Sequence, residues 1–455
     1  MGCAYYDPSH GIEMMNEPIG GLFGFGGWVA ALVIGLGAVA VAGDAPSTVQ
    51  SSICQNRSPC RVIETLDAGR SDDGARLTVL HVALGDDQPL AEIEADSLSC
   101  RPYPEEYWLQ EVGQDSQTNY RRLFAFCNDG YGAAGVGEDV VTVGPNRIML
   151  ERTGGSAWRW EFAATYQLVP ERPLSRRERS YHTAIGGCLE TETDFRTLTQ
   201  RGWFDPPPPE EALGEETTFC DRKTAPGQFL GIPWLESGDS DLVAKLEEQA
   251  AGLGDCALVL NAGGGENTGF VIHGQPDPLA ETEVRVLAPT VNTLLVQIRD
   301  PGRTPAVSAN WIHDDRLELW FGPSLYDGYP RAERQRELRQ FGIRLADGAV
   351  FAGYGKSKAL PVARRWQRGD ARLLLVDWSD TGLEPYAVTV VYGQGDGRQQ
   401  GRMIATSALR YGNPDTLGQF WGFPANCELR DGLLNVGELR PEAAARMENE
   451  DTGSP

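Results

Sequence analysis

The stretch that decides the fold reads 284-VRVLAPTVNTLLVQIRDPG-302, followed by 304-TPAVSANWIHDDRLELWFGPSLYDGYP-330. Apolar side chains recur at every second position over residues 294–299 and again over residues 316–321. A period of two predicts strands with one buried face. The first run ends at the turn signal Asp300-Pro301-Gly302. The two runs therefore predict a β core in this half of the chain.

The order of these features is strand, Asp turn, then an Asp-Asp-x-x-Glu strand, carried by residues 294–300 and by Asp314, Asp315 and Glu318. This order resembles family 9 carbohydrate-binding modules and the related DOMON domains. The resemblance covers residues 232–437. It implies an antiparallel, jelly-roll-like β-sandwich and non-catalytic binding of a carbohydrate or cell-envelope glycan. The DOMON side of the resemblance leaves a haem or redox protein open as an alternative.

Composition favours a mainly β protein of two domains. Glycine (54) and proline (29) are abundant among 455 residues, and heptad repeats are absent. The run DPPPPEE at residues 205–211 predicts an extended linker. The expected parts are a signal peptide or membrane anchor (1–43), a mainly β domain of unknown role (44–205), the Pro-rich linker (206–231), the sandwich with one short helix near Ser240 (232–437) and an acidic disordered tail (438–455). The first domain is similar to uncharacterised secreted bacterial proteins at CNDGYG (127–132) and GGSAWRW (154–160).

Export is predicted by the uncharged apolar segment 20–42, which ends in A-x-A patterns typical of signal-peptide cleavage. The expected location is the periplasm, the cell surface or the extracellular space. Contact with a membrane would occur only through this segment, if it is not cleaved. A formal net charge of −24 argues against nucleic acid as a partner, because phosphate binding needs clustered Lys and Arg.

Nine cysteines are present, and Cys3 precedes the apolar segment. The remaining eight form an even set, which in an exported chain predicts four disulfides. Eight cysteines allow on the order of a hundred pairings. The simplest choice joins neighbours and then the two ends of the sandwich: Cys54–Cys60, Cys100–Cys127, Cys188–Cys220 and Cys256–Cys427.

Aromatic side chains of the second domain are the candidate ligand-binding residues, since flat aromatic rings stack on the apolar faces of sugars. Trp320 is expected to face outward, and the others lie in expected loops: Trp311, Tyr326 and Tyr329. Core or rim packing is the alternative role for each of them. Asp314, Asp315 and Glu318 offer oxygens for a structural calcium ion, or else cap a turn and line the solvent face. No other cofactor is predicted.

No catalytic residue is predicted. The sequence contains no G-x-S-x-G or H-E-x-x-H motif, and G-x-G-x-x-G at residues 130–135 lacks the following helix of a dinucleotide site. The motifs favour a non-catalytic protein. A glycan-active hydrolase stays open as an alternative and needs two carboxylates roughly 5–9 Å apart in a cleft. A structural or protein-interaction role in the cell envelope is the other alternative.

Overall fold

The computed structural model describes a large part of the chain: residues 53–54, 60–84, 105–126, 138–155, 157–182, 187–206, 222, 225, 227–235, 240–261, 269–276, 282–301, 304–323, 331–383, 387–418 and 422–437. The expected leader and tail lie outside these residues. Within the described part, every helix is too short or too polar to cross a bilayer.

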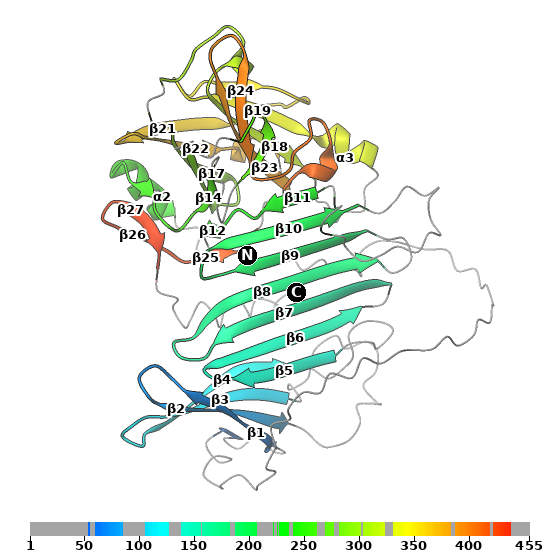
Figure 1. Ribbon diagram of the computed structural model, residues 1–455, viewed down its shortest axis with the longest axis vertical. Helices are drawn as coiled ribbons and strands as arrows, with labels where there is room; N and C mark the ends of the chain where they lie inside the picture. Colours follow the sequence, from blue (N-terminus) through cyan, green and yellow to red (C-terminus); the bar gives the residue numbers. More distant parts are fainter. Residues whose placement is uncertain are drawn as a thin grey trace, which may run out of the picture. The chain divides into compact units, whose positions relative to one another are not determined.

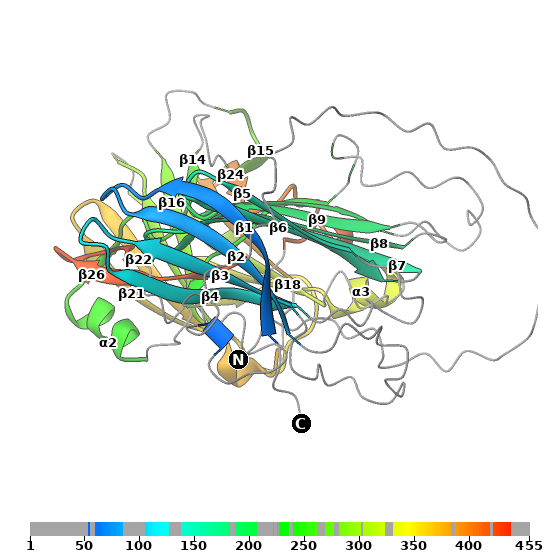
Figure 2. The same cartoon turned by 90° about the horizontal axis from the view of Figure 1, so that it is seen from below.

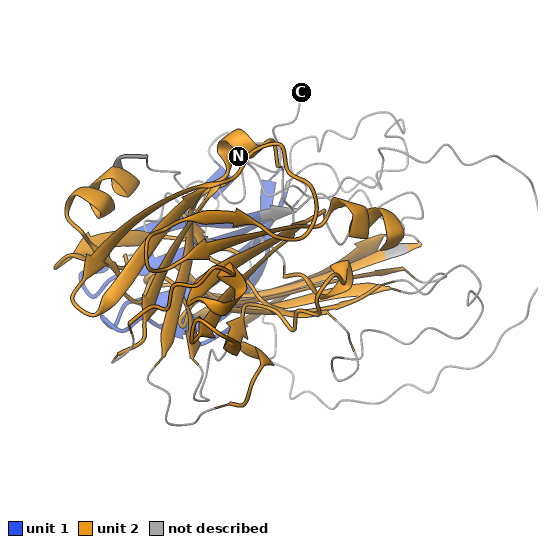
Figure 3. Cartoon of the chain, turned by 90° about the horizontal axis from the view of Figure 1, so that it is seen from above, with its two compact units in different colours: residues 1–128, 144–146, 440–455 blue, residues 129–143, 147–439 orange. Residues whose placement is uncertain are grey.

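The chain forms two compact units (Figure 3), one of residues 1–128, 144–146 and 440–455 and one of residues 129–143 and 147–439. Residues 227–230, which fall within the expected linker, form a strand that pairs with residues 201–204, with Trp203 opposite Gln228. The chain therefore returns to the same sheet after residues 206–226. The domain limits stay a prediction.

The first unit contains a four-stranded antiparallel meander, visible in Figure 2. Its strands follow one another in sequence order: β1 (Cys60–Arg70), β2 (Arg76–Leu84), β3 (Glu105–Val112) and β4 (Thr118–Phe126). Leu80 and Val82 of β2 pack with Ile53 and the Cys54–Cys60 disulfide in a small core.

The second unit begins with a seven-stranded antiparallel sheet whose strands again keep sequence order (Figure 1). These strands are β5 (Glu138–Gly144), β6 (Arg147–Gly155), β7 (Trp158–Gln167), β8 (Arg172–His182), β9 (Cys188–Asp194), β10 (Thr199–Asp205) and β11 (Gly227–Leu230). At its β11 end this sheet is hydrogen-bonded to a later part of the same unit: Leu230 N donates to Thr406 O at 2.7 Å.

A β-sandwich follows, as predicted, and is built from two larger sheets. The first contains, in spatial order, β21 (Val362–Arg368), β22 (Ala371–Asp377), β17 (Thr293–Arg299), β16 (Glu283–Thr290), β12 (Trp234–Leu235) and β25 (Pro424–Ala425), with β14 (Leu258–Asn261) also on β16. The second contains β15 (Phe270–His273), β24 (Gln400–Ala405), β23 (Ala387–Gly395), β18 (Arg316–Gly322), β19 (Arg339–Arg344) and β20 (Val350–Ala352).

The two predicted strand runs are β17 and β18, and they lie in opposite sheets. Leu294, Val296 and Ile298 of β17 meet Leu317 and the other inward residues of β18 in one shared core. The expectation of a single buried face is wrong, because the outer face of each sheet is covered as well. Helix α2 (Ser240–Glu248), which confirms the predicted short helix, helps to cover the first sheet through Leu246.

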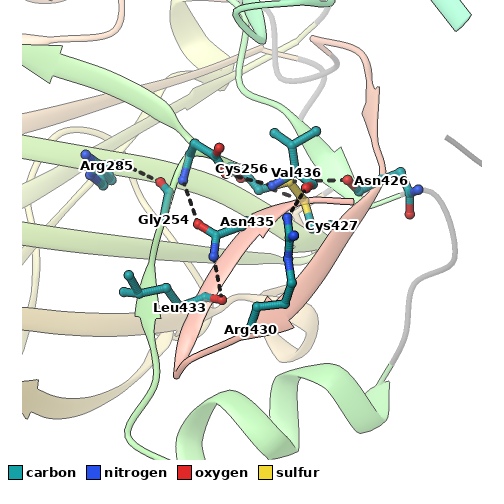
Figure 4. The surroundings of a disulfide bond; sticks show 10 residues. Gly254, Cys256, Arg285, Asn426, Cys427, Arg430, Leu433, Asn435 and Val436 are labelled. Atoms are coloured by element: carbon teal, nitrogen blue, oxygen red, sulfur yellow. Dashed lines mark hydrogen bonds between the residues drawn. A yellow bond between two sulfur atoms is a disulfide. The ribbon is translucent and has the colours of Figure 1, made fainter. Parts of the chain in front are cut away.

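The back of the first sheet also carries a small three-stranded sheet of β13 (Gly252–Leu253), β26 (Cys427–Arg430) and β27 (Leu433–Val436). The Cys256–Cys427 disulfide links it to the segment after β13, where the Asp255 backbone N–H donates to Asn435 Oδ1 at 3.4 Å. Figure 4 shows this disulfide and Arg285, which donates to Gly254 O. This disulfide and Cys54–Cys60 confirm two predicted pairs. Cys188 is also disulfide-bonded, while Cys100, Cys127 and Cys220 lie outside the described residues.

Candidate functional site

The outer face of the second sheet carries the polar half of β18. Arg316, Glu318 and Trp320 point to this face, while Leu317 and Leu319 point into the sandwich core. All seven residues of β18 are buried. A charged pair and a tryptophan are thus enclosed on a surface that strand alternation alone would leave to solvent.

Glu318 is the centre of the enclosed polar group. Its Oε1 accepts from Arg316 Nε at 2.7 Å. Its Oε2 accepts from Trp320 Nε1 at 3.2 Å and from Gln340 Nε2 at 2.8 Å. The carboxylate therefore accepts three hydrogen bonds from protein donors, and it fixes the orientation of the Trp320 ring.

Arg316 completes this group and connects it to a second aromatic residue. Its guanidinium donates to Asp314 O at 3.3 Å and lies 5.9 Å from the centroid of the Trp311 ring. Trp311 lies in the short 3-10 helix η2 (Trp311–His313) and stacks on Phe351, with 6.0 Å between the ring centroids. An added Cβ at Gly342 would lie 2.1 Å from the Trp311 ring, so glycine there lets the indole lie flat on β19.

Beside this group, two tyrosines stand over the buried Trp320 ring. Tyr411 lies edge-on to Trp320 at 5.1 Å between centroids, and Tyr354 lies 6.0 Å from Trp320. Tyr354 and Tyr411 also meet edge to face at 5.7 Å. Tyr411 keeps 74% of its surface exposed while Trp320 keeps 1%. The arrangement is an aromatic platform, here defined as Trp320, Tyr354 and Tyr411, with Tyr411 open to solvent.

The loop that carries Tyr411 is held by a dense set of hydrogen bonds. Arg410 N donates to Thr416 Oγ1 at 2.8 Å, and Asn413 N donates to Arg410 O at 2.9 Å. Asn413 also caps the 3-10 helix η4 (Pro414–Thr416). These contacts hold the loop, and with it the backbone of Tyr411, in place.

A shallow groove of about 490 Å³ adjoins the platform and shares Tyr354 with it. One wall is helix α3 (Arg331–Glu337) with Arg336 and the following Arg339, and the other is the loop Tyr354–Gly355–Lys356. Helix α3 is fixed to η4 by a buried ion pair, Arg334 Nη2 to Asp415 Oδ1 at 2.6 Å. We call this feature the α3 groove.

The structure corrects one predicted binding residue and leaves others open. Trp320 lies on the outer face of its sheet but is only 1% exposed, because Leu338, Leu409 and Leu417 cover it. Trp311 is half-buried against Phe351. Tyr326 and Tyr329 lie outside the described residues.

The calcium role expected for Asp314, Asp315 and Glu318 gains no support from their contacts. Asp315 Oδ1 accepts from Gly395 N at 2.9 Å, and Asp314 faces Arg344 Nη1 at 3.5 Å. Glu318 accepts hydrogen bonds from Arg316, Trp320 and Gln340. Among the described residues, no three carboxylate, histidine or cysteine side chains converge as metal ligands would.

A second concentration of charge crosses the seven-stranded sheet. Glu161, Arg179 and Glu190 are cross-strand neighbours on β7, β8 and β9. Glu190 is fully buried and is also paired with Arg177 at 3.1 Å and with Arg222. Burial raises the pKa of Glu190, but the surrounding guanidinium groups lower it by more, so the pKa lies below its usual range. The positive and negative groups balance each other, and the cluster holds strands together.

Sequence reasoning missed Tyr354, Tyr411 and the α3 groove. Tyr354 and Tyr411 come from distant loops, and each stands in an unremarkable turn sequence next to a glycine. The one usable signal was an aromatic residue in a polar, glycine-containing loop.

Comparisons with known proteins find only a weak structural similarity. No protein-family model matches the chain, and no curated protein is significantly similar in sequence. Among solved structures, a family 9 carbohydrate-binding module from Caldicellulosiruptor kristjanssonii with cellotriose matches with a TM-score of 0.24 at 10% identity, covering 36% of this chain and 87% of that one. The glucose complex of a family 9 module from the same organism matches with a TM-score of 0.25 at 10% identity, covering 42% and 97%. Similarity at this level leaves the function to be argued from the residues of this chain.

Proposed function

We propose that the second unit is a non-catalytic carbohydrate-binding module whose contact surface is the aromatic platform with the α3 groove. The observation that carries the proposal is Tyr411, a largely exposed ring held on a fixed loop against two further aromatic rings. An exposed Tyr ring supplies flat apolar area with a polar tip at little conformational cost, which suits it to contact with a ligand. Rigid Tyr and Trp rings are suited to the C–H faces of sugars.

The chemistry of the surroundings supports binding without catalysis. None of the described residues that line the α3 groove carries a carboxylate. Hydrolysis by the common two-carboxylate mechanism would require such a pair. The disulfides are consistent with an oxidising compartment, where a glycan ligand would be met at the cell surface or outside the cell.

The test is a glycan-array screen of the full chain, followed by calorimetry with any glycan that binds. Tyr411→Ala should weaken binding at least about tenfold, the loss typical of a central aromatic contact. Val362→Ala, an exposed apolar residue on the edge strand of the other sheet, is the matched control and should bind as the parent does. If no glycan binds, or if Tyr411→Ala and Val362→Ala bind equally well, the proposal fails.

A further inference from the structure

The α3 groove has a charge opposite to that of the molecule as a whole. Three cationic side chains line it, Arg336, Arg339 and Lys356, and no described lining residue is acidic. The chain carries a formal net charge of −24. A local concentration of cations would attract an anionic ligand to the groove.

The position of Arg339 is built into the backbone. Its Nη1 donates to the carbonyl oxygens of Arg336 at 2.8 Å and Leu338 at 2.9 Å, which holds the guanidinium at the end of α3. Gly355 has a φ of +78°, and a Cβ there would lie 2.2 Å from Leu338 O. Glycine thus permits the close approach that brings the two walls together.

The cations are only weakly offset by neighbouring acids. Glu337 reaches Arg339 Nη2 at 3.4 Å and Glu333 reaches Arg336 at 3.6 Å, and both acids are largely exposed. Lys356 is exposed and makes no ion pair within the described residues. Solvated pairs of this kind contribute little, so the arginines can exchange these partners for a ligand carboxylate.

We infer that the groove selects acidic saccharides: a sugar ring would contact Tyr354 and Tyr411 while its carboxylate or sulfate would meet Arg339 and Lys356. The inference rests on the proposed function and specifies its ligand class. Tyr354 links the two parts, since it lines the groove and touches Tyr411.

The experiment uses the full chain and pairs of uronic-acid oligosaccharides with their carboxyl-reduced counterparts. Galacturonate, glucuronate and mannuronate oligomers each serve as one pair, so that only the carboxylate differs. At least one acidic member should bind tenfold or more tightly than its reduced counterpart by calorimetry. The preference should shrink as sodium chloride rises, because the contacts are partly exposed.

Two charge-reversal variants locate the effect. Lys356→Glu should abolish the preference, so that the acidic member no longer binds more tightly than its reduced counterpart. Lys358→Glu changes a second exposed lysine that does not line the groove and should keep the preference. Equal binding of acidic and reduced members would overturn the inference while leaving carbohydrate binding intact. Absence of any saccharide binding would overturn both proposals, and equal affinity for a short oligonucleotide would reduce the groove to a general anion site.

Discussion

Replacing Glu318 with glutamine is the sharpest test of how the platform is held. Arg316 and Glu318 form an ion pair at 2.7 Å with side chains 1% and 5% exposed. The substitution keeps the size of the side chain, and the amide oxygen can still accept from Trp320 and Gln340. Arg316 loses its charged partner and stays buried, a change that costs about 3–5 kcal/mol.

A double-mutant cycle separates this pair from the packing around it. Arg316→Met alone leaves the Glu318 carboxylate buried without a cation and should cost a similar amount. The double variant Glu318→Gln with Arg316→Met removes both charges, so its cost should fall well below the sum of the two single costs. The coupling energy should reach several kcal/mol, far above the roughly 0.5 kcal/mol expected of independent sites.

Local hydrogen exchange followed by mass spectrometry suits this protein, because the chain has two units and a single global unfolding transition is not assured. Backbone amides of β18 and β19 should exchange roughly two to four orders of magnitude faster in each single variant. Peptides from β1–β4 in the first unit serve as the internal control and should be unchanged. Additive costs in the cycle would show that the two charges are not coupled, and the account of Glu318 as the centre of the site would be wrong.

Two further predictions concern stability. Glu190 has a lowered pKa in the folded state, so its stabilising contribution should be present above the unfolded value of about 4.3 and be lost as the pH falls through the folded value. The difference in thermal unfolding between the parent and Glu190→Gln should therefore shrink below about pH 4, and a difference that stays constant with pH would contradict this. Removing the Cys256–Cys427 disulfide by a double Cys→Ser substitution should cost about 5 kcal/mol by loop entropy, since its sequence separation is 171. The Cys54–Cys60 disulfide, with a separation of 6, should cost only about 2 kcal/mol, and the reverse order in denaturant unfolding would contradict the loop argument.

The local sequence pattern was sufficient to predict the two central strands and two of the disulfides. Alternation identified β17 and β18, and the even cysteine count with neighbour pairing led to both disulfides that the structure describes in full. The strands that pair with β17 and β18 could not be predicted from the sequence. Residues 294–299 pair with β16 and β22, while residues 316–321 pair with β19 and β23 in the other sheet. Period-two alternation carries no information about which strand comes to lie alongside.

The prediction that Trp320 is exposed failed for a related reason. Alternation correctly places it opposite to Leu319 and Phe321, but a strand has no record of what covers its second face. Leu409 and Leu417 arrive from the segment after β24, some ninety residues further along. The same segment brings Tyr411 to the surface above Trp320. Trp320, which was expected to contact a ligand, therefore supports the platform. Tyr411, which no sequence pattern indicated, takes the exposed position.

This division of roles explains why charge and aromatic contact can be combined in one site of an acidic protein. Arg316 and Glu318 neutralise each other inside the sheet face and add no net field at the surface. The field at the α3 groove is then set mainly by the cations that line it, Arg336, Arg339 and Lys356. Because exposed charges are screened beyond about 8 Å at physiological salt, these near cations outweigh the distant acids for a ligand seated in the groove. Selectivity for an acidic sugar would thus depend on a few exposed side chains, while the buried pair determines only where the aromatic rings stand.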